Sequence, residues 1–162
     1  MKTQIAKERL TNYFNEAKKH IAKIESVKRA LDKVMPLDIE GFYKLLETEQ
    51  DKLDVLVFRF SKLQDLLGRK IFRAILEYSG FDINISFVKI LSELEKESLL
   101  DVNRWVSLRD VRNAIAHEYP NEEENMIEEI NFIYKEVWYL VDVTQKLEEY
   151  FYEINSKRDR DY

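Results

Sequence analysis

The chain has 162 residues, a length that one domain with a substantial buried core accounts for. Apolar residues make up 45% and charged residues 35%, and the chain has only three glycines and two prolines, which is typical of a helical protein. The lack of cysteine excludes disulfides and zinc–thiolate sites, and the net charge of −5 argues against a broad, nonspecific nucleic-acid surface.

The first residues lead directly into an amphipathic pattern and lack the apolar segment of a signal peptide. No apolar run approaches the roughly 20 residues that a membrane-spanning helix needs. We therefore expect a cytoplasmic protein that makes no membrane contact.

The first predicted helix covers about Thr3 to Val34, because its apolar residues recur at steps of three and four. Pro36 ends it, since proline cannot continue the hydrogen-bond ladder. His20 and Lys28 lie among other charged residues of this helix, so we expect both on a solvated face.

The second helical region covers about Ile39 to Tyr78, with Asp38 as a candidate N-cap. An irregularity is expected at Gly41 or near residues 50–51. The pair Ser79–Gly80 is a typical helix stop.

Two shorter helices follow, one capped by Ser86 and ending near Glu97, the other capped by Asp101 and carrying Trp105 in its apolar stripe. Pro120 separates them from a last long helix, about 122–153. Residues 156–162 are so rich in charge that we expect a flexible tail after a single helical domain of residues 1–155.

The chain shows no strand-like alternation and no fixed-period repeat. These patterns predict an all-α, up-and-down helical bundle of about five helices, with a short helix before the last long one.

The most informative segment, Arg112–Tyr119, reads R-N-A-I-A-H-E-Y and ends that short helix. Successive residues of a helix turn by about 100°, which places Arg109, Arg112, Asn113 and His117 on one flank beside the apolar stripe. Asn113 and His117 are four residues apart and can touch.

These side chains have the chemistry needed at an RNA phosphodiester. Arginine forks onto two phosphate oxygens and stabilises developing negative charge. Histidine exchanges a proton near neutral pH, and asparagine can orient the imidazole or donate to the phosphate. RNA supplies its own nucleophile in the 2′-hydroxyl, so this chemistry requires neither a metal nor another cofactor.

A simpler interpretation stands beside this one. The helix dipole favours a histidine in the last turn whether or not it reacts, and Arg109 and Arg112 could pair with Asp110 or nearby glutamates. In that case the segment is a solvated helix end in an ordinary helical bundle.

The segment from Leu108 to Tyr119 resembles the signature of HEPN-domain ribonucleases, R-x(4–6)-H, with a polar residue after the arginine. More narrowly, R-x-x-x-x-H-x-Y resembles the HepT toxins, which are encoded beside a minimal nucleotidyltransferase antitoxin. The stretch Leu63–Arg69 in a central helix and the position of the motif fit the same family.

The resemblance implies a HEPN-like domain that forms a homodimer, with two motifs facing one RNA across a cleft. Arg112 and His117 would be catalytic, with Asn113 in support; Arg109, which matches no diagnostic position of the family, could steer the RNA phosphates or only pair. Tyr119 would be the site that the partner nucleotidyltransferase adenylylates, which adds negative charge and bulk beside the phosphate site.

The expected function is thus a metal-independent endoribonuclease toxin. One alternative is a non-catalytic HEPN module that binds a minimal nucleotidyltransferase as its substrate or regulatory partner. The other is a structural bundle in which the motif is accidental.

Overall fold

The computed structural model describes residues 2–116 and 123–161, and helices are the only regular secondary structure in these ranges. The prediction of an all-α helical bundle is confirmed. Within the same residues, no helix combines the length and the apolar character that crossing a bilayer requires.

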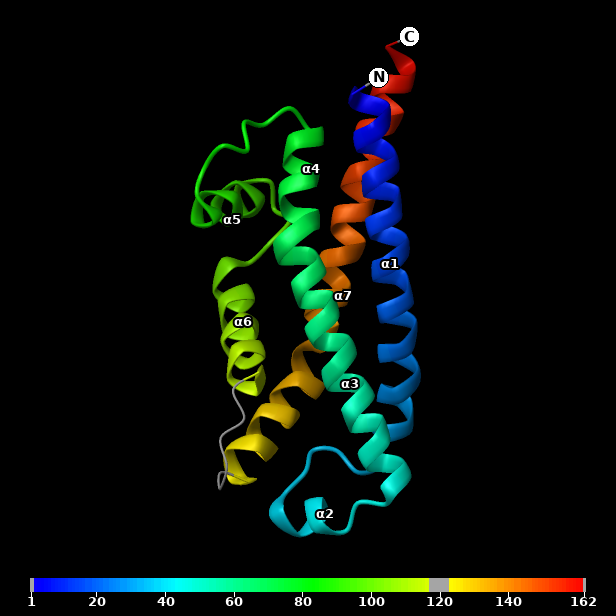
Figure 1. Ribbon diagram of the computed structural model, residues 1–162, viewed down its shortest axis with the longest axis vertical. Coiled ribbons are helices and arrows are strands. Elements are labelled where there is room, and N and C mark those ends of the chain that lie inside the picture. Colours follow the sequence, from blue (N-terminus) through cyan, green and yellow to red (C-terminus); the bar gives the residue numbers. More distant parts are fainter. Residues whose placement is uncertain (1, 117–122, 162) are drawn as a thin grey trace.

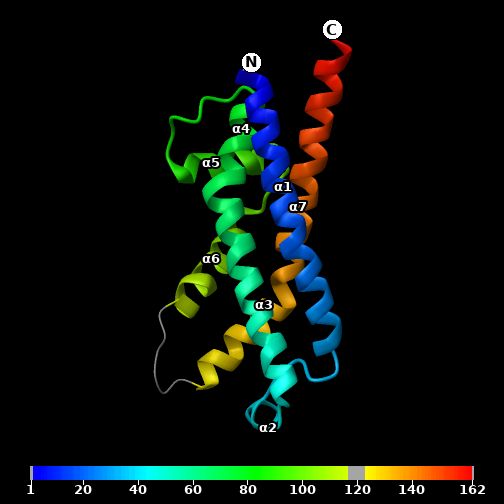
Figure 2. The same cartoon turned by 45° about the vertical axis from the view of Figure 1, so that its right-hand side comes forward.

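The long helices run side by side along the molecule in alternating directions (Figures 1 and 2). Helix α1 (Lys2–Leu31) runs down from the end that holds both termini, and α3 (Glu47–Leu66) and α4 (Phe72–Tyr78) return beside it. Helix α6 (Val102–Ala116) descends again, and α7 (Glu123–Arg160) returns to the starting end. The short α2 (Ile39–Tyr43) lies at the opposite end.

One cluster of buried apolar side chains holds these helices together. The expected stripes contribute to it, as illustrated by Phe14 of α1, Phe60 of α3 and Val137 of α7, which are all at most 2% exposed. Trp105 brings α6 into the same core, where its ring lies edge-on to Phe72 with the centroids 4.6 Å apart.

The second helical region is interrupted twice. Residues 44–46 separate α2 from α3, so the break lies between the two positions that the sequence suggested. The second interruption is a π-helical turn, η1 (Leu67–Ile71), between α3 and α4. A Cβ on Gly68 would lie 3.0 Å from the Trp105 ring, so the missing side chain lets α6 pack closely on this turn.

The predicted helix signals are confirmed at several boundaries. Asp38 accepts a hydrogen bond from the Gly41 N–H, and Ser86 caps α5 (Phe87–Lys96) by accepting from Lys89. After α4, Gly80 has φ +99°, and the N–H of Phe81 donates to the carbonyl of Leu76. This is the left-handed stop that a glycine at this position favours.

Helix α7 is longer than the sequence suggested, because it continues to Arg160 through the charged segment that we expected to be a flexible tail. Arg158 explains the extension: its guanidinium lies 4.1 Å from the centre of the Tyr78 ring and donates to the Tyr78 carbonyl. The domain limit expected at residue 155 therefore falls inside a helix.

Two polar residues of α1 are buried, contrary to the expectation of a solvated face. His20 is 8% exposed and contacts Arg59 of α3, with its Nδ1 3.1 Å from Nη1 of the arginine. Lys28 is 7% exposed, and its ammonium lies 4.4 Å and 4.6 Å from the centres of the Tyr134 and Trp138 rings. Burial lowers the pKa of both side chains.

A pocket between the π-helical turn and helix α6

Helix α6 presents two different faces. Trp105 and Leu108 are 1% exposed and anchor the helix to the core. Arg109 and Asn113 are exposed, and the side chain of Arg112, bordering the core, is 23% exposed. This is the division that the helical spacing predicted.

One pocket of about 250 Å³ is lined by Arg109, Arg112 and Asn113, the described α6 residues that the sequence singled out. The opposite wall comes from the end of α3 and from the π-helical turn, and Phe87 of α5 closes one side. Its lining is Gln64, Asp65, Gly68, Arg69, Phe87, Trp105, Arg109, Arg112 and Asn113.

The pocket has a positive balance, because it is lined by three arginines and a single carboxylate, Asp65. Arg112 is already paired with that carboxylate, at 3.1 Å between Nη2 and Oδ2. The pairing partner comes from α3 and not from Asp110 or another residue of α6. The pair is partly exposed, at 23% for Arg112 and 31% for Asp65, so solvent screens it.

Arg109 and Arg69 remain exposed at the pocket. The Arg109 guanidinium lies 5.5 Å from the centre of the Phe87 ring, which is within cation–π range. The arrangement offers guanidinium donors to an anionic ligand within a chain whose net charge is −5.

Several buried polar atoms of the pocket lining have no hydrogen-bond partner among the described residues. They are both amide atoms of Gln64, the indole Nε1 of Trp105 and the Nε of Arg112. A buried polar group without a partner costs about 1–3 kcal/mol of stability. Such a concentration at one pocket makes it a candidate binding site for a polar ligand.

The other two residues singled out in the motif, His117 and Tyr119, lie outside the described residues. The structure therefore brings Arg109, Arg112 and Asn113 together. The convergence of the guanidinium and the imidazole on one groove stays a prediction.

Sequence reasoning did not single out Gln64, Asp65 or Arg69 as site residues. One signal was available for Gln64, which occupies a helix position flanked by the buried Phe60, Leu63 and Leu67. A polar residue within an apolar stripe is unusual unless it has a specific partner or function. Asp65 gave no such signal, because its role depends on a contact with α6.

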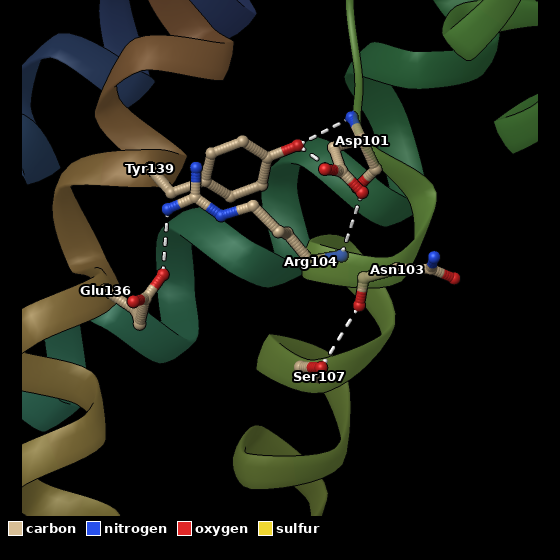
Figure 3. Close-up of polar contacts among 6 residues, drawn as sticks. All are labelled: Asp101, Asn103, Arg104, Ser107, Glu136 and Tyr139. Atoms are coloured by element: carbon tan, nitrogen blue, oxygen red, sulfur yellow. Dashed lines mark hydrogen bonds and ion pairs between the residues drawn. The ribbon is translucent and has the colours of Figure 1, made fainter.

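The opposite end of α6 carries a different polar cluster (Figure 3). The Asp101 N–H donates to the Tyr139 hydroxyl at 2.7 Å, and Arg104 lies over the Tyr139 ring at 4.0 Å while pairing with Glu136 at 2.8 Å. Burial raises the pKa of Tyr139, which therefore stays a neutral phenol. A larger pocket of about 500 Å³ adjoins this cluster.

The smaller pocket is the better candidate site, although it has half the volume. Four of its buried polar atoms lack partners among the described residues, whereas Tyr139 and Arg104 at the larger one are engaged with Asp101 and Glu136. A comparison of the chain with protein-family models, curated proteins and solved structures finds no match. The geometry and chemistry of the pocket, with the motif resemblance, are thus the basis for a functional assignment.

Proposed function

We propose that the chain is a metal-independent endoribonuclease, the toxin of a toxin–antitoxin pair, with its active site at the pocket between η1 and α6. The observation that carries the proposal is the grouping of Arg109, Arg112 and Asn113 around one pocket whose lining has polar atoms without partners in the described part of the chain. The resemblance of the segment Arg112–Tyr119 to HEPN ribonucleases gives that grouping its chemical meaning.

In the proposed reaction, the 2′-oxygen of the RNA attacks the adjacent phosphorus and the bond to the 5′-oxygen breaks. The products are a 2′,3′-cyclic phosphate and a 5′-hydroxyl. His117 accepts the proton of the 2′-hydroxyl, and the same residue of a second subunit donates a proton to the leaving 5′-oxygen. Arg112 leaves Asp65 and stabilises the charge that grows on the phosphate oxygens, with Asn113 in support.

The homodimer, the nucleotidyltransferase partner and the modification of Tyr119 belong to the same proposal. A nucleotide on Tyr119 would add negative charge and bulk within the motif that is proposed to bind the RNA phosphate. Adenylylation would thus silence the nuclease by repulsion and occlusion.

The second candidate is a non-catalytic HEPN module that binds a minimal nucleotidyltransferase. The ion pair between Arg112 and Asp65 favours it, because a catalytic arginine that is already paired must first be released.

The deciding experiment is incubation of the purified protein with total RNA in EDTA. We expect cleavage by the parent protein, and a loss of about a hundredfold or more in Arg112→Ala and His117→Ala. Arg104→Ala is the matched control: it removes an arginine from the other end of the same helix, so cleavage should persist. Intact RNA with the folded parent protein, or full activity of both site variants, contradicts the nuclease assignment.

Modification is tested with the cognate nucleotidyltransferase and labelled ATP. We expect label on the parent protein and none on Tyr119→Phe. Binding of the partner and labelling of Tyr119 without any RNA cleavage would instead support the non-catalytic module.

A further inference from the structure

One exposed face of α3 leads to the pocket and combines an aromatic ring with positive charge. Phe58 is 52% exposed although it is a large apolar residue in the middle of a helix. Lys62 follows it by one turn, Asp65 by two, and Arg69 continues in the same direction on η1. Since a helix rises by 1.5 Å per residue, Phe58 lies about 10 Å along the axis from Asp65 at the pocket.

Two cations flank the Phe58 ring. The Lys62 ammonium lies 5.5 Å and the Arg59 guanidinium 5.6 Å from its centre. We call Phe58, Arg59, Lys62 and Arg69 the α3 strip. Asp65 lies between Lys62 and Arg69 along this face, and its negative charge is offset by Arg112 until Arg112 moves to the phosphate. The exposed Asp54, one turn before Phe58, marks the end of the positive region.

The buried His20 holds Arg59 in place. Burial and the charges of Arg59 and Lys62 lower the pKa of His20, against an opposing effect of Glu16. A neutral imidazole can accept the hydrogen bond from Nη1 of Arg59, which fixes the guanidinium beside the Phe58 ring. The Arg59 guanidinium is thus positioned by His20 of the neighbouring helix α1 and is not a freely solvated side chain.

We propose that the α3 strip binds single-stranded RNA, with one base stacked on Phe58 and the following phosphates on Lys62 and Arg69. An exposed aromatic ring interleaved with cations is the usual arrangement of surfaces that bind single strands. The inference rests on the proposed function, because the strip leads to the pocket where the phosphodiester would be cleaved. It deepens that function by naming a single strand with an accessible base as the substrate class.

The strip is tested by the binding of a fluorescent single-stranded 2′-O-methyl oligoadenylate, which cannot be cleaved because its 2′-oxygen is blocked. We expect Phe58→Ala to weaken binding about tenfold and Phe58→Trp to preserve it. Lys62→Gln should lower the dependence of log K on log salt by about 0.7, the value for one phosphate contact on a single strand.

Two controls separate base stacking from general damage. Tyr152→Ala removes another aromatic side chain of similar exposure, 53%, from α7, and it should leave the affinity unchanged. An oligomer with abasic sites offers no ring to stack, so Phe58→Ala and the parent protein should bind it equally.

Parent-like affinity of Phe58→Ala for the oligoadenylate overturns the proposal, as does an equal loss with the abasic oligomer. Dissociation of an oligomer by Phe58→Ala, seen in sedimentation, would overturn it by assigning the face to a second copy of the chain. Cleavage that does not depend on Phe58 leaves the nuclease standing without the strip. Binding that depends on Phe58 without cleavage leaves the strip standing without the nuclease, and the absence of both binding and cleavage defeats both.

Discussion

The two ends of α6 carry polar clusters of opposite character. At its start, Tyr139, Arg104 and Glu136 are engaged with each other and with Asp101, and the helix is fastened to α7 (Figure 3). Towards its other end, Gln64 and Arg112 retain buried polar atoms without partners among the described residues. We expect the first cluster to stabilise the fold and the unsatisfied groups of the second to lower its stability.

This difference shows how one helix can serve two purposes. The satisfied cluster and the buried Trp105 fix the position of α6. The polar groups at the pocket are then available to a ligand, because Trp105 and the contacts to α7 already fix the position of the helix. If this interpretation is correct, substitutions at the two ends should change stability in opposite directions.

The largest expected effect on stability comes from Gln64→Leu at the pocket. Leucine is apolar and of roughly similar size, and it removes two amide atoms that have no partner among the described residues, so the free energy of unfolding should rise by about 2 kcal/mol. Binding of the oligoadenylate should weaken in the same variant. Urea denaturation measures the first quantity and fluorescence anisotropy the second.

Gln145→Leu is the control for that comparison, because it makes the same change at an exposed position of α7 and should alter stability by less than about 0.5 kcal/mol. A loss of stability in Gln64→Leu would show that the amide has a partner in solution, and the contrast between the two ends would disappear.

A smaller effect is expected from Tyr139→Phe at the start of α6. The ring that supports Arg104 remains, but the Asp101 N–H loses its acceptor. We expect a loss of about 1 kcal/mol, since water can replace part of the bond at this exposed position. Faster amide exchange in the first turn of α6 would locate the change.

Tyr150→Phe provides the comparison for this variant, since it removes a hydroxyl from the same helix for which no hydrogen bond is seen within the described residues. Equal stability of the two variants would mean that the Tyr139 hydroxyl does not fasten α6.

The local features of the site could be predicted from the sequence, but its long-range contacts could not. The grouping of Arg109, Arg112 and Asn113 depends only on helical spacing, and all three line the same pocket. The pairing of Arg112 with Asp65 depends on how α6 packs against α3, which no local pattern specifies.

The errors at His20 and Lys28 have a different origin. Both lie near the core stripe of α1, beside Ile24, and helical spacing alone would have placed them inward. Their charged neighbours suggested a solvated face instead. Their partners, Arg59 of α3 and the two aromatic rings of α7, became visible only in the assembled bundle.

The smallest predicted effect on the free energy of unfolding comes from the turn that precedes α6. Ser98, in the turn between α5 and α6, has φ +59°, where a side chain is unfavourable and glycine is not. Its N–H donates to the Glu95 carbonyl, so the turn closes α5 in the left-handed form. Ser98→Gly should therefore raise the free energy of unfolding by about 0.5–1 kcal/mol in urea denaturation.

Ser92→Gly is the control at an exposed position inside α5. It should lower the free energy of unfolding by a similar amount, because glycine is unfavourable within a helix. If both variants lose stability, Ser98 is not strained in its left-handed conformation.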